Sequence, residues 1–183
     1  MIYLNDDIAA FDWQAALPLL SEQRREQCLK FRHEQGRKTC AAVYLLLCEG
    51  LRKEYGMTER PVFEYGEHGK PSIKGHPEIF FNMSHCREAA ICVLSDVPVG
   101  VDVESIRSYN ESLARYTMSE AEMERIEKAE HPNIEFIRLW TLKEAVLKRS
   151  GEGIRNDMKH VLDCLKEAKT EINEKKGYIF SVV

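Results

Sequence analysis

Valine occupies every second position of the stretch Val99-Gly100-Val101-Asp102-Val103-Glu104. This period of two predicts a β-strand with one apolar face. Asp102 and Glu104 then share the opposite face, about 7 Å apart along the strand. One interpretation is the solvated outer face of an edge strand. The other is a site for a divalent cation, because carboxylate oxygens suit Mg²⁺.

A second segment, Trp140-Thr141-Leu142-Lys143-Glu144-Ala145-Val146-Leu147-Lys148, is predicted to be helical. Trp140, Glu144 and Lys148 are spaced four residues apart and form one stripe on that helix. As an exposed ion pair, Glu144 and Lys148 would contribute only about 0.3–0.5 kcal/mol. A carboxylate and an ammonium one turn apart also suit phosphoryl transfer, in which one binds metal or accepts a proton and the other neutralises developing charge.

Hydrophobic periodicity and turn residues predict the elements around these two segments. We expect helices over Glu22–Phe31, Arg37–Tyr55, Ser119–Lys128, Ile134–Ser150 and Asp157–Leu165. We expect strands over Ile2–Leu4, Pro61–Tyr65, Ile79–Met83, Ala89–Leu94, Val99–Glu104, Lys169–Ile172 and Tyr178–Val183. The last two should form a terminal hairpin that turns at Lys175-Lys176-Gly177. Ser119 and Glu122 form a capping box, Asn133 can cap the longer helix, and Gly56 and Gly151 follow helix ends. Such mixed runs in each half favour an α+β fold over a regularly alternating parallel sheet.

Composition bounds the classes of protein to which the chain can belong. With 183 residues, 44% of them hydrophobic and 31% charged, the chain is neither disordered nor collagen-like. A net charge of −4 offers no overall basic field for nucleic acid or an anionic membrane. Without a membrane span or a signal peptide, we expect a cytoplasmic protein. The six cysteines include no C-x-x-C pair and are interpreted as buried free thiols rather than zinc ligands.

Two further segments carry polar groups that suit a site. Phe81-Asn82-Met83-Ser84-His85 ends a predicted strand in asparagine, serine and histidine, at a rim where function usually lies. Gly69-Lys70-Pro71 belongs to a predicted turn. Each segment also has an ordinary structural explanation. His85 could be a hydrogen-bonded structural histidine, and Gly69-Lys70-Pro71 could be an ordinary turn.

In order and spacing, these segments resemble the 4′-phosphopantetheinyl transferase superfamily, in its larger pseudo-dimeric type with a WxxKEA motif. The matching segments are Gly69-Lys70-Pro71, Phe81–His85, Val99–Glu104, Leu139–Ala145 with Lys148, and Gly151-Glu152-Gly153-Ile154. The basic stretch from Arg24 to Lys38 is similar to the family's N-terminal helix region, and Tyr178–Val183 is similar to its last strand. The resemblance thus spans most of the chain, and the Asp-x-Glu strand combined with the Trp-x-x-Lys-Glu-Ala helix is its most specific part.

The resemblance implies two similar α/β lobes related by a pseudo-twofold, over residues 1–98 and 99–183, with coenzyme A in the cleft between them. It also implies a reaction. The phosphopantetheine arm of coenzyme A passes to a serine hydroxyl of an apo acyl or peptidyl carrier protein, and 3′,5′-ADP is released. The chain would act as a monomer, and exposed residues between Ser105 and Met118 would receive the carrier.

The resemblance further implies roles for particular side chains. Asp102, Glu104 and Glu144 would bind Mg²⁺ on the coenzyme A pyrophosphate, which would also relieve the repulsion between the two strand carboxylates. Glu144 would act as the general base, and Lys148 would steady phosphate charge. The remaining coenzyme A contacts would come from Lys70, Ser84 and His85, and for the 3′-phosphate from Arg24, Arg25, Arg37 or Lys38.

One departure from the family pattern follows His85. Cys86 stands where relatives carry serine, and a thiol is a weaker hydrogen-bond partner than a hydroxyl. A phosphate contact at this position is therefore weakened, although Arg87 could compensate.

Two other functions use the same residues. A metal-dependent nuclease or phosphatase would keep the carboxylates and Mg²⁺ but hydrolyse its substrate without a carrier protein. The absence of a basic surface and of a second metal cluster counts against it. A non-catalytic module that binds coenzyme A or a carrier protein would retain its function when Glu144 is replaced by Gln.

Overall fold

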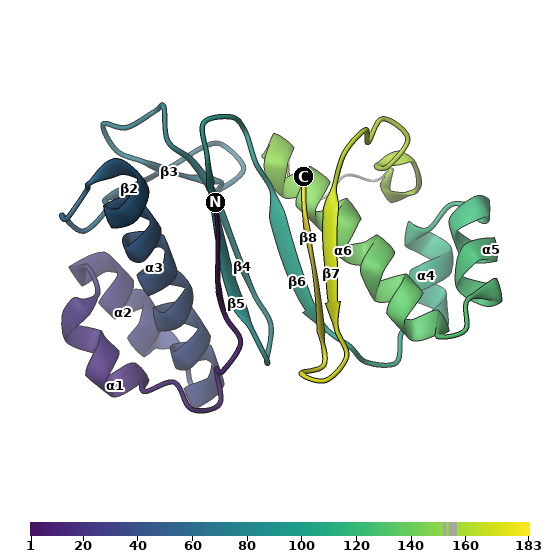
Figure 1. Ribbon diagram of the computed structural model, residues 1–183, viewed down its shortest axis with the longest axis horizontal. Coiled ribbons are helices and arrows are strands. Elements are labelled where there is room, and N and C mark those ends of the chain that lie inside the picture. Colours follow the sequence, from purple (N-terminus) through teal and green to yellow (C-terminus); the bar gives the residue numbers. More distant parts are fainter. Residues whose placement is uncertain (152, 154–156) are drawn as a thin grey trace.

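Two three-stranded sheets lie against each other in the computed structural model, which describes residues 1–151, 153 and 157–183 (Figure 1). The first sheet has the order β1-β5-β4 and consists of β1 (Ile2–Asn5), β5 (Ala90–Ser95) and β4 (Phe80–His85). The second has the order β6-β8-β7 and consists of β6 (Val101–Ser105), β8 (Tyr178–Val182) and β7 (Lys169–Asn173). All of these strand pairs are antiparallel.

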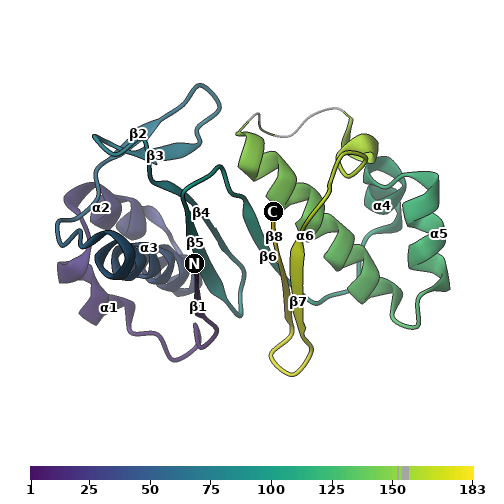
Figure 2. The ribbon, with the colours of Figure 1, turned by 45° about the horizontal axis from the view of Figure 1, so that its top comes forward.

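Alternation along the strands explains the layers. In β5, Ile91 and Val93 contact the apolar face of the second sheet, which includes Val101, Val103 and Phe180. The residues between them, such as Cys92, pack under the long helix α3 (Glu34–Tyr55). Ile179 of β8 packs on the other side, against α6 (Pro132–Ser150). The order is therefore helix, sheet, sheet, helix, and Figure 2 shows α3 and α6 set apart on the two sides.

The two sheets have the same connectivity. In each, a first strand leads through short helices into a long helix, and a terminal hairpin then places the last strand in the middle of the sheet. In the first set the short helices are α1 (Trp13–Ala16), the 3₁₀ turn η1 (Leu17–Leu19) and α2 (Glu22–Lys30). In the second they are α4 (Glu111–Thr117) and α5 (Glu120–Lys128), and a 3₁₀ turn η2 (Met158–His160) follows α6. A small hairpin of β2 (Phe63–Tyr65) and β3 (Pro71–Ile73) precedes β4.

Much of the predicted secondary structure is confirmed. The Ser119–Glu122 capping box opens α5, and the left-handed glycines Gly56 (φ 66°) and Gly151 (φ 74°) follow α3 and α6. The mixed α+β class and the terminal hairpin are also as expected. Of the predicted motif Gly151-Glu152-Gly153-Ile154, Glu152 and Ile154 lie outside the described residues.

Some boundaries were predicted wrongly. His131, not Asn133, precedes α6, because Pro132 occupies the first helical position, where its fixed φ and missing N–H are tolerated. Only the short η2 forms within the helix predicted from Asp157 to Leu165. After η2 the chain continues in turns, with backbone bonds from the Asp163 amide to the His160 carbonyl oxygen and from the Leu165 amide to the Leu162 carbonyl oxygen. The short elements α1, α4 and β3 were not predicted, because three to seven residues hardly show a period. No helix among the described residues is long and apolar enough to cross a membrane.

Candidate active site

The predicted carboxylate strand β6 lies under helix α6, so its acidic face is covered. Asp102 is only 4% exposed, and the interpretation of this face as a solvated outer surface is therefore wrong. The cause is Gly100, where an added Cβ would lie 1.9 Å from the carbonyl oxygen of Ala145 and 2.7 Å from the amide nitrogen of Arg149. Only glycine lets the α6 backbone approach this closely. The approach brings Glu144 and Lys148, on either side of Ala145, over Asp102.

Asp102 is fixed through one oxygen of its carboxylate. The Lys148 ammonium lies 2.6 Å from Asp102 Oδ1, and the Ser84 hydroxyl donates to the same oxygen at 2.8 Å. Lys148 also donates to Ser84 Oγ at 3.0 Å, so the three side chains form a closed triangle. The other oxygen, Asp102 Oδ2, is buried and has no hydrogen-bond partner among the described residues. A buried, unpaired carboxylate oxygen is costly, which makes it a natural ligand for a cation.

Glu104 and Glu144 extend the negative charge around Asp102. Burial raises the pKa of the Glu104 carboxyl, and repulsion from Asp102 raises it further, against Arg107, Lys148 and a hydrogen bond from Trp140. Burial likewise raises the pKa of Glu144, and the charges of Asp102 and Glu104 add to this effect against Lys148. Lys148 is thus the main positive charge facing three acidic groups, and the excess negative charge suits a hard divalent cation.

The metal site expected from the sequence is incomplete in this arrangement. Among the described residues, no group of three or more His, Cys, Asp and Glu side chains is arranged so that it could hold a metal ion. The donor chemistry nevertheless fits Mg²⁺, which commonly takes one or two carboxylates and completes its shell with waters and phosphate oxygens. Asp102 Oδ2 is the oxygen that lacks a partner, and Glu104 and Glu144 are the neighbouring carboxylates.

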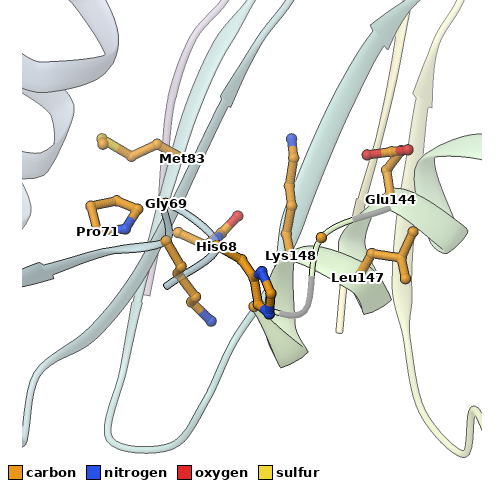
Figure 3. Close-up of a pocket in the computed structure, with 11 residues that line it drawn as sticks. His68, Gly69, Pro71, Met83, Glu144, Leu147 and Lys148 are labelled. Carbon is orange, nitrogen blue, oxygen red and sulfur yellow. The ribbon is translucent and has the colours of Figure 1, made fainter. Parts of the chain in front are cut away.

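These side chains line a cleft between the two sheets. One pocket of about 450 Å³ is bounded by Ser84, His85, Asp102, Glu104, Trp140 and Glu144, among others. An adjoining pocket of about 270 Å³ shares Met83, Glu144 and Lys148 with it and continues to His68, Lys70 and Leu147. Figure 3 shows Lys148 and Glu144 rising from α6 across from Met83 and the turn of His68 and Gly69. The cleft is thus acidic and cationic at one end and more apolar at the other.

Comparison with known proteins shows which family carries this arrangement. The family model described as "4'-phosphopantetheinyl transferase superfamily" matches residues 98–180, which include Asp102, Glu104, Glu144 and Lys148. Over these residues the chain is similar to this superfamily. Sfp, a 4′-phosphopantetheinyl transferase of Bacillus subtilis, is 26% identical over 84% of this chain and 70% of its own length. A second 4′-phosphopantetheinyl transferase from that species is 27% identical over the same shares. AcpT of Salmonella typhi is 40% identical over half of each chain.

Lys70 and His85, two of the residues predicted to contact coenzyme A, line the cleft. Lys70 donates to the carbonyl oxygen of Arg149 at 2.7 Å, and burial lowers the pKa of its ammonium. His85, at the end of β4, has a lowered pKa because of desolvation and the positive charges of Arg24 and Lys148. A neutral imidazole beside two cations is an environment that favours an anion. The roles of Lys70 and His85 stay predictions.

The predicted 3′-phosphate residues lie outside the two cleft pockets. Arg24 is buried, and its Nε and Nη2 donate to the carbonyl oxygen of Cys40 at 3.1 and 3.0 Å. Arg37 donates from Nε to the carbonyl oxygen of Phe31 at 2.9 Å, and its guanidinium lies over the Trp13 ring. Both side chains therefore take part in packing α2 against α3, and the assignment of the 3′-phosphate to them stays a prediction.

The site also contains residues that sequence reasoning had not assigned. Gly100 sets the approach of α6, and Asn82 lies buried beside β6. Their signals were present in the sequence, as a glycine inside a strand and as an asparagine two residues before Ser84. What each contacts depends on the packing of two sheets, which no local pattern specifies.

Proposed function

We propose that the protein is a Mg²⁺-dependent 4′-phosphopantetheinyl transferase that moves the phosphopantetheine group of coenzyme A to a serine hydroxyl of an apo acyl or peptidyl carrier protein. The match to the superfamily model and the names of the similar proteins support the reaction. The observation that carries the proposal is the buried, unpartnered Asp102 Oδ2 among Glu104, Glu144 and Lys148. Two lobes over residues 1–98 and 99–183, related by a pseudo-twofold, are supported by the shared connectivity of the two sheets.

The reaction is a phosphoryl transfer, which asks the protein mainly for positioning and charge stabilisation. The serine Oγ forms a bond to the phosphorus that bears the pantetheine arm, while the bond from that phosphorus to the bridging oxygen breaks. The electron pair of that bond leaves with 3′,5′-ADP. A bound Mg²⁺ would neutralise the charge that develops on the pyrophosphate oxygens.

The chain's own groups supply the remaining steps. Glu144 accepts the serine proton, and its raised pKa suits a base that must take and release a proton. Lys148 already donates to Asp102 and Ser84, and an ammonium has three donors, so one can reach a phosphate oxygen. Asp102 and Glu104 would hold the metal from β6. His85 and Lys70 contact the phosphates and nucleotide of coenzyme A.

The proposed partner is the carrier protein, and the proposed docking surface is the segment from Ser105 to Met118. Within it, Tyr116 and Leu113 are the exposed large apolar side chains, at 66% and 41% exposure. They lie on α4, which follows β6 in the chain. Because coenzyme A is an intracellular metabolite, we expect the reaction to occur in the cytoplasm. The cleft is built from one chain, so we expect a monomer to suffice.

Mass spectrometry of an apo carrier protein incubated with coenzyme A, Mg²⁺ and the protein tests the proposal. We expect a carrier heavier by one phosphopantetheine group, formed about 10²–10⁴-fold more slowly with Glu144→Gln. The matched control is Glu64→Gln, which changes an exposed glutamate on β2 and should leave the yield unchanged. Binding of coenzyme A with several apo carriers left unmodified would instead support a binding module. Cleavage of coenzyme A without a carrier would support a phosphohydrolase.

A further inference from the structure

The junction between β4 and β6 is closed by side chains instead of a backbone ladder. These strands belong to different sheets. On one edge β6 pairs with β8, and there Gly100 and Val183 exchange backbone hydrogen bonds. On the other edge, the amides of Val101 and Val103 face β4. In a single sheet they would donate to backbone carbonyls of the neighbouring strand.

Two side chains of β4 accept these amides. The Val101 amide donates to Asn82 Oδ1 at 3.1 Å, and the Val103 amide donates to Ser84 Oγ at 3.3 Å. All four groups are buried. Asn82 and Ser84 are two residues apart, as are Val101 and Val103, so the period of one strand matches that of the other. Asn82 and Ser84 together form what we call the side-chain ladder.

Asp102 lies between the two rungs of this ladder. The amides of its neighbours Val101 and Val103 are bonded to side chains of β4. Asp102 itself pairs with Ser181 of β8. The backbone of Asp102 is therefore held from both edges. Its carboxylate is directed so that Oδ1 contacts Ser84 and Lys148, while none of the described residues bonds to Oδ2.

Ser84 has no hydrogen-bonding capacity left in this arrangement. Its single O–H donates to Asp102, and its two lone pairs accept from the Val103 amide and from Lys148. Asn82 Oδ1 likewise accepts an amide of β6, and the residue also lines the smaller pocket. Both side chains therefore hold β6 against β4.

We propose that Asn82, together with Ser84, is a positioning residue that fixes the Asp102 carboxylate for the metal ion. The inference rests on the proposed function, because the position of the Asp102 carboxylate affects activity only if that carboxylate binds the metal ion. Groups that orient a metal ligand are typically worth 10–100-fold in metal affinity or activity. A bond that served only the stability of the fold would leave metal affinity unchanged.

Substitutions at Asn82 separate these two roles. Asn82→Leu keeps the size of the side chain but removes the acceptor, whereas Asn82→Asp retains an acceptor for the Val101 amide. Asn5→Ala is the matched control, since Asn5 Oδ1 accepts the Asp7 amide at 3.0 Å at the end of β1, away from the junction. The readouts are amide hydrogen exchange by NMR, Mn²⁺ binding in the presence of coenzyme A by electron paramagnetic resonance, and the thermal unfolding midpoint.

We expect Asn82→Leu to speed exchange of the Val101 amide and to weaken Mn²⁺ binding about 10–100-fold. The turnover number should fall by a similar factor while KM for the carrier is unchanged. Asn82→Asp should restore protection of the Val101 amide, and Asn5→Ala should match the wild type in exchange at Val101 and in Mn²⁺ binding.

Three results would overturn the positioning role. One is wild-type Mn²⁺ affinity in Asn82→Leu with only a lower unfolding midpoint. The second needs no variant that folds: rapid exchange of the Val101 and Val103 amides in the wild-type protein would show that the ladder is absent. The third is a wild-type protein that binds no Mn²⁺ with coenzyme A, which contradicts the proposed function as well and is thereby distinguished from the first two.

Discussion

Asp102 shows how one residue combines stability and function at a cost. Its Oδ1 is paired with Lys148 and Ser84, but Oδ2 is buried and has no partner within the part of the chain that the structure describes. Glu104 and Glu144 add two further acidic groups. The metal-free cleft therefore holds more negative charge than Lys148 neutralises. Buried charges without compensation destabilise a fold. We infer that the cleft is stabilised when its cation binds.

Replacing Glu144 by Gln removes one of these acidic groups and tests both its catalytic role and its cost to stability. We expect transfer to fall about 10²–10⁴-fold through loss of the base. Because the pKa of Glu144 is raised in the folded protein, the ionised form is disfavoured there. Stability from this group is therefore present below its unfolded pKa and is lost as pH rises through the raised folded value. Thermal unfolding in chelator should thus show less loss of stability with rising pH in Glu144→Gln than in the wild type. An equal loss in both proteins would contradict the assignment.

Replacing Lys148 by Met removes the cation that faces Asp102. The lysine side chain is 31% exposed and that of Asp102 is 6% exposed, so we expect a loss below the ~3–5 kcal/mol of a fully buried pair, about 1–3 kcal/mol. Mg²⁺ should restore more stability to Lys148→Met than it adds to the wild type. Denaturant unfolding with chelator and with Mg²⁺ measures both effects. The control Lys53→Met removes an exposed partner of Glu49 and should change stability by less than about 1 kcal/mol.

Among the elements, several start and stop signals were predicted correctly from sequence, although the cap predicted at Asn133 was not. The capping box at Ser119 and the glycines after α3 and α6 are local devices, and they appear where the sequence indicates. The strand at β6 was also predicted, together with the sharing of one face by Asp102 and Glu104. The burial of that face was not predicted, because it depends on how closely a distant helix can approach. Gly100 permits that approach, and its partner Ala145 lies 45 residues further along the chain.

Gly100→Ala tests this packing directly. The added Cβ would lie 1.9 Å from backbone oxygen of Ala145, so either β6 or α6 must shift. We expect a loss of about 1–3 kcal/mol or more and a larger relative loss of transferase activity, since Glu144 and Asp102 move apart. Gly66→Ala is the matched control, because its Cβ would meet only the Lys70 carbonyl oxygen at 3.8 Å. Full activity in Gly100→Ala would contradict the role given to this approach.

At the scale of the whole molecule, the two sheets share one core. Ala89, Ile91 and Val93 of the first sheet pack against Val101 and Phe180 of the second, so neither sheet can bury this face alone. The sequence predicted the strands of both sheets and the terminal hairpin, but not the packing of one sheet on the other, since face-to-face packing of two sheets leaves no local signature. The carboxylates could be named from motifs, whereas the ladder of Asn82 and Ser84 required the two sheets to be placed.

This shared core predicts that both halves unfold together. The two tryptophans report on them separately, since Trp13 lies in α1 and Trp140 lies in α6. We expect the single-tryptophan variants Trp13→Phe and Trp140→Phe to give fluorescence transitions that each coincide with the far-UV circular dichroism transition of the same variant. A fluorescence transition separated from that of circular dichroism in either variant would show that the halves unfold independently.

Acidic groups from β6 and from α6 are expected to share one divalent cation with coenzyme A. Crystals of the protein grown with Mn²⁺ and coenzyme A would locate that ion by its anomalous scattering. We predict a peak within about 2.0–2.4 Å of a carboxylate oxygen of Asp102, with Glu144 on the opposite side and pyrophosphate oxygens completing the shell. Bound coenzyme A without a Mn²⁺ peak between Asp102 and Glu144, or with the ion held elsewhere, would contradict the claim that these two carboxylates share a cation.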